Sequence, residues 1–301
     1  MERAAELAGL IARRVSRDGR TASPIQGVSL YRASRPTSIE AAVYEPALIL
    51  VAQGRKQSYL AGKEYTYDAQ RYLILSATLP VHSQVRLASP ESPFLSLAVA
   101  LEPAALGRLL LEMDERAEAP GPLQTGICAS TAPDVLFDAA IRLVRAMEQP
   151  TDSRILGPLC IQEILYHVLN GPQGSFLRTI AHRQGPRHRI THVLNLIHTS
   201  YADALDVPSL AEAAGMSVSS FHNAFKEVTS HAPLQYVKAI RLHRARTLMV
   251  HEGAGVGEAA YHVGYASVSQ FSREFRRFFG RPPSEELARL RAESEAYATE
   301  A

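Results

Sequence analysis

Two stretches in the last third of the chain repeat one pattern, and this repeat limits the possible folds more than any other feature. Residues 209–229 and 257–279 each hold a short alanine-rich segment, a turn glycine and a longer second segment. Apolar positions four residues apart lie on one helix face and would seat each second helix on a small core. The key phenylalanines recur after 50 residues, Phe221 and Phe225 as Phe271 and Phe275.

Residues that favour helix starts stand where the repeat predicts them. Ser209 with Glu212, and Ser267 with Gln270, have the spacing of a capping box, and Ser217 predicts a simple N-cap. Ser, Asn, Gln and Arg can match the donors and acceptors of base edges in the major groove, and a recognition helix presents them at its N-terminus. The residues predicted to be exposed there are Ser219, His222 and Asn223 in the first copy, and Ser269, Gln270, Ser272 and Arg273 in the second.

Between the copies, residues 234–250 predict one continuous helix. A helix of about 17 residues spans about 25 Å. A rigid spacer of this size can hold two recognition helices about one DNA turn, roughly 34 Å, apart.

The distribution of charge supports a polyanionic partner at one end of the chain. Residues 1–180 hold 18 Lys/Arg against 18 Asp/Glu, whereas residues 181–284 hold 12 against 7. The remaining residues, 285–301, are acidic, with two against five. A neutral body joined to a basic module is typical of proteins that bind nucleic acid through one domain.

Other features predict a cytoplasmic protein with no membrane contact. No apolar run approaches the roughly 18 residues that a membrane span needs. The first 20 residues place Leu7, Leu10, Ile11 and Val15 on one face of an amphipathic helix, unlike a secretory signal. Two cysteines in so long a chain form no disulfide framework and suit a reducing compartment.

The chain changes texture near residue 125, which predicts an α+β protein of two domains. Before that point, short apolar runs broken by turn residues predict the strands of a small barrel or sandwich. After it, apolar stripes predict helices at about 134–148 and 154–170. A polar segment with Gly and Pro, residues 182–189, predicts the linker. We therefore expect one domain over 1–181, with its barrel at about 25–110, and an all-helical domain over 190–288. The predicted strands are Val28–Ala33, Ala47–Ala52, Glu64–Tyr67, Arg71–Leu75, Pro80–Leu87 and Phe94–Leu101.

Over residues 190–285 the chain resembles the DNA-binding domain of the AraC/XylS regulators. The resemblance rests on an ordered set of short motifs, among them Ala214-Gly215-Met216-Ser217, Ile240-Arg241-Leu242, Val263-Gly264-Tyr265 and the run from Phe271 to Pro283. It implies a double helix-turn-helix domain that binds double-stranded DNA, with base contacts from Ser219, His222, Asn223, Ser269, Gln270 and Arg273. It also implies phosphate contacts from Ser217, Lys226, Ser267, Arg276 and Arg277.

Two positions depart from this family pattern. Ser230 stands where the family usually has Gly after the first recognition helix, and a non-glycine residue strains a left-handed helix end. Gly257, near the start of the second unit's first helix, is expected to loosen that helix.

The N-terminal region resembles the N-terminal domain of one AraC-type subgroup over about residues 25–110. The matching text includes Gln53-Gly54-Arg55-Lys56, Arg71-Tyr72-Leu73 and Leu79-Pro80-Val81. This resemblance implies a cupin-like β-barrel that can hold a small-molecule effector, with the helices at 134–148 and 154–170 as the contact of a homodimer. The candidate pocket residues are Tyr59, Tyr72 and His82, and RNA polymerase is a candidate partner.

We expect no enzyme, no cofactor and no metal, and weigh three alternatives. A cupin-fold enzyme with a helical appendage would usually hold a metal through His, Glu and His ligands, and the barrel region has a single histidine, His82, too few for a His-based site. An N-terminal domain with a purely structural role would bind no effector. Cys128 and Cys160 could sense redox changes, although buried, unreactive thiols are the more common case. The glycines from Gly253 to Gly257 lack a preceding strand, so we interpret them as an interhelix loop and not a phosphate loop.

Overall fold

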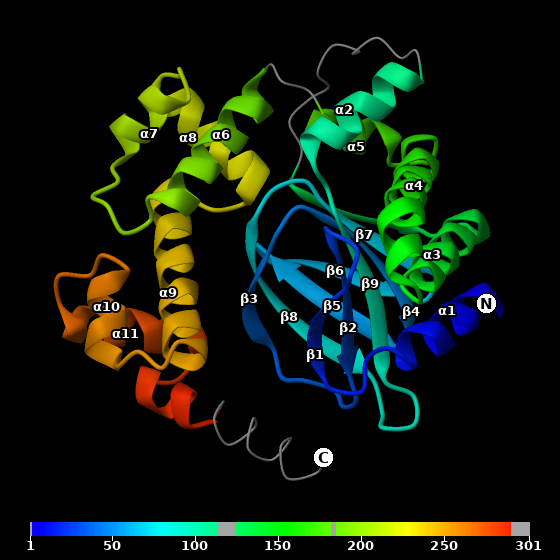
Figure 1. Cartoon of the computed structure of the whole chain (residues 1–301). Coiled ribbons are helices and arrows are strands. Elements are labelled where there is room, and N and C mark those ends of the chain that lie inside the picture. Colours follow the sequence, from blue (N-terminus) through cyan, green and yellow to red (C-terminus); the bar gives the residue numbers. More distant parts are fainter. Residues whose placement is uncertain (1, 114–124, 182–184, 290–301) are drawn as a thin grey trace. The chain divides into compact units, whose positions relative to one another are not determined.

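The computed structural model describes residues 2–113, 125–181 and 185–289 of the chain. It divides into two compact units, one of residues 1–39 and 44–188 and the other of residues 189–301 with the short segment 40–43. The first unit is rich in β-sheet and the second is helical, so the chain has the expected α+β architecture (Figure 1). Among the described residues, no helix is both long and apolar enough to span a membrane.

The strands form the two sheets of a cupin-like barrel, and apart from residues 40–43 of β3 they lie in the first unit. The six-stranded sheet has the order β1-β2-β9-β4-β7-β10, and the four-stranded sheet has the order β3-β8-β5-β6. Neighbouring strands with a recorded register are antiparallel. Their bounds are β1 Gly19–Ala22, β2 Val28–Ala33, β3 Glu40–Tyr44, β4 Ala47–Gln53, β5 Arg55–Leu60, β6 Lys63–Asp68, β7 Arg71–Leu75, β8 Leu79–Leu87, β9 Phe94–Ala100 and β10 Ile127–Thr131.

All six predicted strands are present with bounds that differ by at most one residue, but four further strands escaped prediction. β1 and β5 are largely polar, so they lack the apolar runs used to find the others. The corner between β4 and β5 depends on Gly54, whose φ is +80°. A Cβ atom at Gly54 would lie 2.5 Å from the Leu87 carbonyl oxygen, so only glycine fits there.

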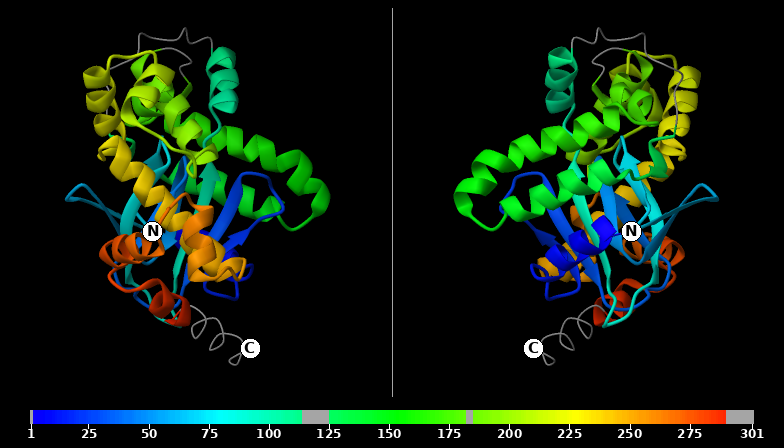
Figure 2. Two further views of the ribbon diagram at one scale, coloured as in Figure 1. Left: turned by 90° about the vertical axis from the view of Figure 1, so that its left-hand side faces the viewer. Right: turned by 90° about the vertical axis from the view of Figure 1, so that its right-hand side faces the viewer.

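In the described part of the first unit, helices α1 to α5 complete the fold and bury one face of the six-stranded sheet (Figure 2). The strands alternate, so Leu48, Leu50 and Ala52 of β4 pack toward the helices. The N-terminal helix buries Leu7, Leu10 and Ile11 as its apolar face predicts. The helices are α1 Glu2–Ala12, α2 Pro103–Glu112, α3 Asp134–Ala146, α4 Pro150–Leu169 and α5 Gly174–Ala181.

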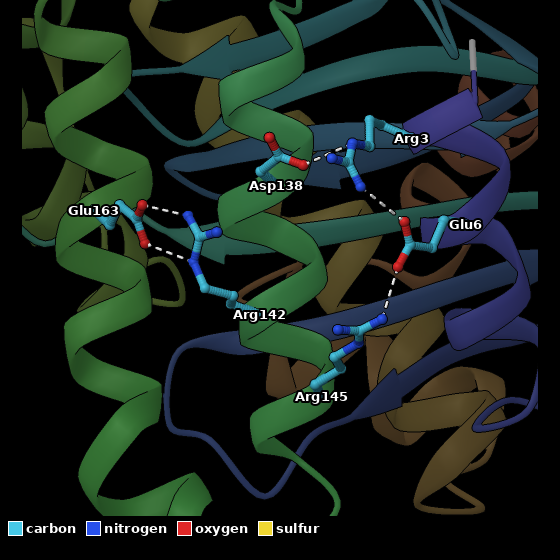
Figure 3. A network of polar contacts seen from close by, with 6 residues as sticks. All are labelled: Arg3, Glu6, Asp138, Arg142, Arg145 and Glu163. Atoms are coloured by element: carbon cyan, nitrogen blue, oxygen red, sulfur yellow. Dashed lines mark hydrogen bonds and ion pairs between the residues drawn. The ribbon is translucent and has the colours of Figure 1, made fainter.

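Ion pairs join the outer surfaces of α1, α3 and α4 (Figure 3). Arg3 Nε lies 3.0 Å from Asp138 Oδ1, and Arg145 lies 2.7 Å from Glu6. Arg142 of α3 donates to both carboxylate oxygens of Glu163 on α4. Pairs this exposed add little stability, about 0–1 kcal/mol each, so the buried side chains of these helices hold them together.

The two predicted apolar stripes are buried only in part. On α3, Leu136, Ala139 and Leu143 are buried, whereas Val135 is 47 % exposed. On α4, Ile164, Leu165, Val168 and Leu169 enter the core. Helix α4 also leaves apolar side chains in solvent, which we call the α4 stripe. Its members are Ile155, Leu156, Leu159 and Tyr166.

The second unit consists of short helices around one long helix. The segment predicted as a linker, 182–189, is helical from Pro186, while residues 182–184 lie outside the described residues. Proline suits the first turn of a helix because the N–H it lacks has no partner there. The helices are α6 Pro186–Thr199, α7 Val207–Ala213, α8 Val218–Thr229, α9 Pro233–His251, α10 Val256–His262 and α11 Val268–Phe279.

Candidate functional site

The first copy of the repeat forms a helix-turn-helix from α7 and α8. The turn contains Gly215 at φ +59°, a left-handed conformation that favours glycine. The Ser217 hydroxyl caps α8 by accepting from the Ser220 N–H, as predicted. The predicted capping box at Ser209 is wrong, because Asp206 caps α7 and accepts from the Ser209 N–H at 2.8 Å. With this start, Pro208 falls in the first turn, where its missing N–H costs nothing.

The second copy repeats this unit in α10 and α11. Ser267 caps α11 and accepts from the Gln270 N–H, whereas the Gln270 amide donates to Glu274 rather than closing a capping box. Gly264 in the turn has φ +85°, and a Cβ there would lie 2.2 Å from the Ala202 carbonyl oxygen. This turn therefore packs against the chain before α7 so closely that only glycine is accommodated.

The recurring phenylalanines form the cores that the repeat predicts. Phe221 and Phe225 are fully buried with ring centroids 5.4 Å apart, and Phe271 and Phe275 are fully buried at 5.5 Å. Tyr236 of α9 packs edge-on against Phe225. Each recognition helix is thus held by its apolar face, which leaves the opposite face free for contacts.

The opposite faces carry the residues predicted to read DNA. The base-reading candidates Ser219, Asn223, Ser269, Gln270 and Arg273 are exposed, and His222 is half-buried. The phosphate candidates Ser217, Lys226, Ser267, Arg276 and Arg277 are exposed too. The structure thus brings each set onto one face of α8 or α11.

The charged candidates are free to meet an anion. No hydrogen bond or ion pair is recorded from the side chains of Lys226, Arg273, Arg276 and Arg277 to any described residue. A guanidinium without a protein partner can bond a guanine edge or a phosphate in two places at once.

A polar network that the sequence did not reveal orients the second recognition helix. Glu274 of α11 accepts from Tyr265 at 2.8 Å, from Lys238 of α9 at 3.1 Å and from Gln270 at 3.3 Å. Burial raises the pKa of Glu274, but these three hydrogen bonds outweigh burial and hold it below its usual value. Only the spacing of four residues between Gln270 and Glu274 could have pointed to this network.

Arg241 of α9 ties the two helix-turn-helix units together. It donates to the carbonyl oxygens of Tyr201 at 2.6 Å and Asp203 at 2.7 Å, and reaches that of Gly264 at 3.5 Å. The loop before α7 and the turn before α11 therefore share one guanidinium. The α9 helix fixes the units as one body.

The two departures from the family pattern behave differently. Ser230 adopts the left-handed conformation at φ 60°, as Gly280 does at φ 80° in the second copy, so the expected strain is present. Gly257 lies in the first turn of α10, where Glu258 accepts from the Gly255 N–H. A glycine there disturbs few helical hydrogen bonds, so α10 forms despite it.

In the barrel, the structure does not bring Tyr59, Tyr72 and His82 together. Tyr59 and His82 pair across β5 and β8, and His82 is exposed. Tyr72 points the other way and is buried beneath the helices that cover the six-stranded sheet. The Tyr59 hydroxyl donates to the side-chain oxygen of Gln57 and accepts from the Gln84 amide, so neighbouring side chains already satisfy it.

A different polar cluster lies between the two sheets, around Lys56. Its Nζ atom is 4.5 Å from the ring centre of Tyr31, 5.4 Å from that of Tyr44 and 6.0 Å from that of Phe94. These rings come from both sheets, so their faces surround the ammonium group. The motif Gln53-Gly54-Arg55-Lys56 contains this lysine, but nothing in the motif indicates that its side chain lies among aromatic rings.

Tyrosine hydroxyls extend the Lys56 cluster. Tyr44 bonds Tyr67 at 3.1 Å, and Tyr67 bonds Ser58 at 3.0 Å. Burial raises the pKa of Tyr44, but the Lys56 charge and the hydrogen bonds of Ser83 and Tyr67 outweigh it and lower the pKa to about 8. The cluster therefore favours negative charge on a phenolic or carboxylic oxygen beside Lys56.

The remaining candidate groups show no arrangement for metal or thiol chemistry. No group of three or more His, Cys, Asp or Glu residues in the described part of the chain is placed to hold a metal ion. Burial raises the pKa of Cys128 to about 12 and also raises the pKa of Cys160. Little thiolate, the reactive form, exists at neutral pH.

Comparison with known proteins places both units. A family profile described as the N-terminus of AraC-type transcriptional regulators matches residues 24–176, and a profile for a helix-turn-helix domain matches residues 210–289. The transcriptional activator RhaS of Escherichia coli O157:H7 is 29 % identical over 143 residues, which are 47 % of this chain and 51 % of RhaS. The uncharacterised regulator YdeC of Bacillus subtilis is 31 % identical over 96 residues, 32 % of this chain and 33 % of YdeC. The matches thus span about half the length of RhaS and a third of the length of YdeC.

Solved structures of ToxT from Vibrio cholerae share the fold. One ToxT structure superposes with a TM-score of 0.59 at 14 % identity, covering 86 % of this chain and 97 % of ToxT. A second, with unsaturated fatty acid bound, gives 0.56 at 12 % identity, covering 86 % and 94 %. The profile matches, the duplicated helix-turn-helix and the barrel agree, and the chain belongs to the AraC family of transcriptional regulators.

Proposed function

We propose that the chain is a sequence-specific DNA-binding regulator of transcription that uses α8 and α11 as recognition helices. The observation that carries this proposal is the pairing of two capped helices with polar, exposed N-terminal faces on one rigid body. The basic side chains Arg273, Arg276 and Arg277 lie on the exposed face of α11. Base-edge and phosphate contacts require this combination.

Footprinting on a selected DNA site tests the proposal. The full chain should protect two patches about one helical turn apart on one face of the duplex, because α9 joins the two recognition helices. Arg241→Ala, which releases the shared guanidinium, should weaken protection of the second patch more than the first. A single short patch, or protection that is independent of sequence, would contradict the proposal.

We propose that the α4 stripe is the contact of a homodimer. Four large apolar side chains in solvent on one helix are uncommon in a monomer, and a second copy offers the same row by symmetry. Buried side chains of α3 and α4 share one core, so the stripe lies on a packed support.

We propose that the Lys56 cluster receives the effector, a small organic acid with an aromatic or apolar body. An ammonium group among three aromatic rings attracts a carboxylate while the rings pack against carbon. One ToxT structure is described as bound to unsaturated fatty acid and another as bound to (E)-4-(8-methylnaphthalen-1-yl)but-3-enoic acid. Both are acids with apolar bodies, which supports the same class of ligand here.

We further propose a cytoplasmic location, contact with RNA polymerase at the regulated promoter, and no enzymatic activity. The relatives named above are transcriptional regulators, which supports this assignment. Stoichiometric iron or zinc in the purified chain would favour a cupin-type enzyme instead, so elemental analysis is the deciding measurement.

A further inference from the structure

A cavity of about 650 Å³ lies in the first unit, outside the space between the two sheets. Its walls come from the turn between β1 and β2, from α2 and from α4 as far as Leu165. Ile25, Leu109 and Leu165 are buried and line it, so part of its wall is apolar. The volume falls within the range of small-molecule sites.

Two arginines and two glutamates line this cavity, and the arginines can bind an anion through charge-assisted hydrogen bonds. Arg108 of α2 and Arg154 of α4 line it, are exposed and have no recorded hydrogen bond or ion pair to a described side chain. Of the acidic residues, Glu112 already accepts from the Gln162 amide. Glu102 directly precedes α2, where the positive end of the helix dipole offsets its charge. Two guanidinium groups remain to bind a ligand.

A proline inside α4 adds a hydrogen-bond acceptor to the same wall. Pro158 lies inside the helix and has no N–H, so the carbonyl oxygen of Arg154 lacks its usual helical donor. Both residues line the cavity. Gly157 between them lets the helix approach the β1–β2 turn, since a Cβ there would lie 2.9 Å from Ile25. A ligand with a hydroxyl or N–H group could donate to the Arg154 oxygen.

We infer that this cavity is a second small-molecule site, selective for an organic acid with an apolar body and bound through Arg154 and Arg108. It is separate from the Lys56 cluster and does not depend on DNA binding. It shares α4 with the α4 stripe, so occupancy acts on the helix proposed to form the dimer contact.

Calorimetric titration of the full chain with three ten-carbon probes tests the inference. Decanoate, decylammonium and decan-1-ol share an apolar chain and differ in charge. Decanoate should bind at least tenfold more tightly than the other two at this site, because charge-assisted hydrogen bonds are the strong ones. Equal binding of decylammonium, or no binding of decanoate, would overturn the inference.

Variants assign the binding to the cavity. Arg154→Gln should weaken decanoate binding here about tenfold or more, and Ala105→Trp, which fills the cavity from α2, should abolish it. Lys56→Met should leave this site unchanged and remove only binding between the sheets. If Lys56→Met removes all decanoate binding while Arg154→Gln and Ala105→Trp have no effect, this inference fails and the proposed effector site stands. The thermal midpoint of each variant checks its folding, and Arg154→Gln at the exposed rim keeps the test valid if Ala105→Trp unfolds.

Discussion

Ser230 is a single residue whose cost can be measured. It ends α8 in a left-handed conformation that glycine adopts without strain. Ser230→Gly should raise the free energy of unfolding by about 0.5–1 kcal/mol, because relief of strain exceeds the added freedom of the unfolded chain. Urea denaturation measures the change. The matched control Gly280→Ser should lower stability by about the same amount, and a loss of stability in Ser230→Gly would refute the strain.

Two arginines on α11 are expected to play different roles in DNA binding. Arg273 lies one turn closer to the N-terminus than Arg277, which is where a recognition helix meets base edges. Arg273→Ala should weaken binding by about 1–3 kcal/mol and relax preference at one base pair, whereas Arg277→Ala should weaken all sequences alike. Selection from random duplexes measures both. Unchanged preference in Arg273→Ala with altered preference in Arg277→Ala would reverse the assignment.

Tyr44 should ionise close to physiological pH. Its pKa of about 8 lies below that of an unfolded tyrosine, about 10, so ionisation stabilises the folded state as pH rises between these values. Phenolate absorbance should therefore show a step near pH 8 that Tyr44→Phe removes. Lys56→Met should move the step to higher pH, because it removes the positive charge that favours the phenolate. An unchanged step in Lys56→Met would show that the lysine does not control this group.

At the scale of elements, the α4 stripe gives a direct test of dimerisation. Leu159 is 58 % exposed at its centre, so Leu159→Glu should leave the fold intact while burying a charge in any dimer. Sedimentation should show the variant as a monomer. Val135→Glu on α3, where the side chain is 47 % exposed, is the matched control and should remain a dimer. Dimers that persist in Leu159→Glu would place the contact elsewhere.

The elements predicted correctly from the sequence are those whose apolar pattern fits only one kind of secondary structure. The strands β2, β4, β7 and β9 are rich in apolar residues, and the repeat carries its phenylalanines at helical spacing. Strand β5 was missed because its inner face is polar, with Lys56 and Ser58, which inverts the usual pattern. The apolar stripes of α3 and α4 were predicted, but the sequence pattern does not show how much of each stripe is buried within its own domain.

The two candidate sites differ in how far the sequence could specify them. The recognition faces follow from helix starts and periodicity, which are local properties. The effector residues do not, because alternation along β7 puts Tyr72 and Ile74 on one face without saying which face the helices cover. The Lys56 cluster joins rings from β2, β3 and β9, which only the sheet topology brings together. Asp206 and Ser209 are both good caps, and Pro208 decides between them.

For the whole molecule, we expect the two units to fold separately. Residues 1–181 should form a compact, metal-free dimer, and a fragment from residue 185 should bind DNA alone. The cut belongs before Pro186, because a start at 190 would remove the first turn of α6. Circular dichroism, sedimentation and DNA binding of each fragment measure this. An aggregated N-terminal fragment, or a C-terminal fragment that cannot bind DNA, would show that each unit needs the other.

The α9 helix has a consequence for how promoters read by this chain can change. Its 19 residues fix a length of about 28 Å, and each inserted residue would turn the second recognition helix by about 100° around the axis. Insertions or deletions in α9 therefore cannot change the preferred distance between half-sites in small steps. A new target site can arise by exchanging side chains on α8 or α11, which changes one half-site at a time. The distance between the two half-sites in the DNA then stays constant.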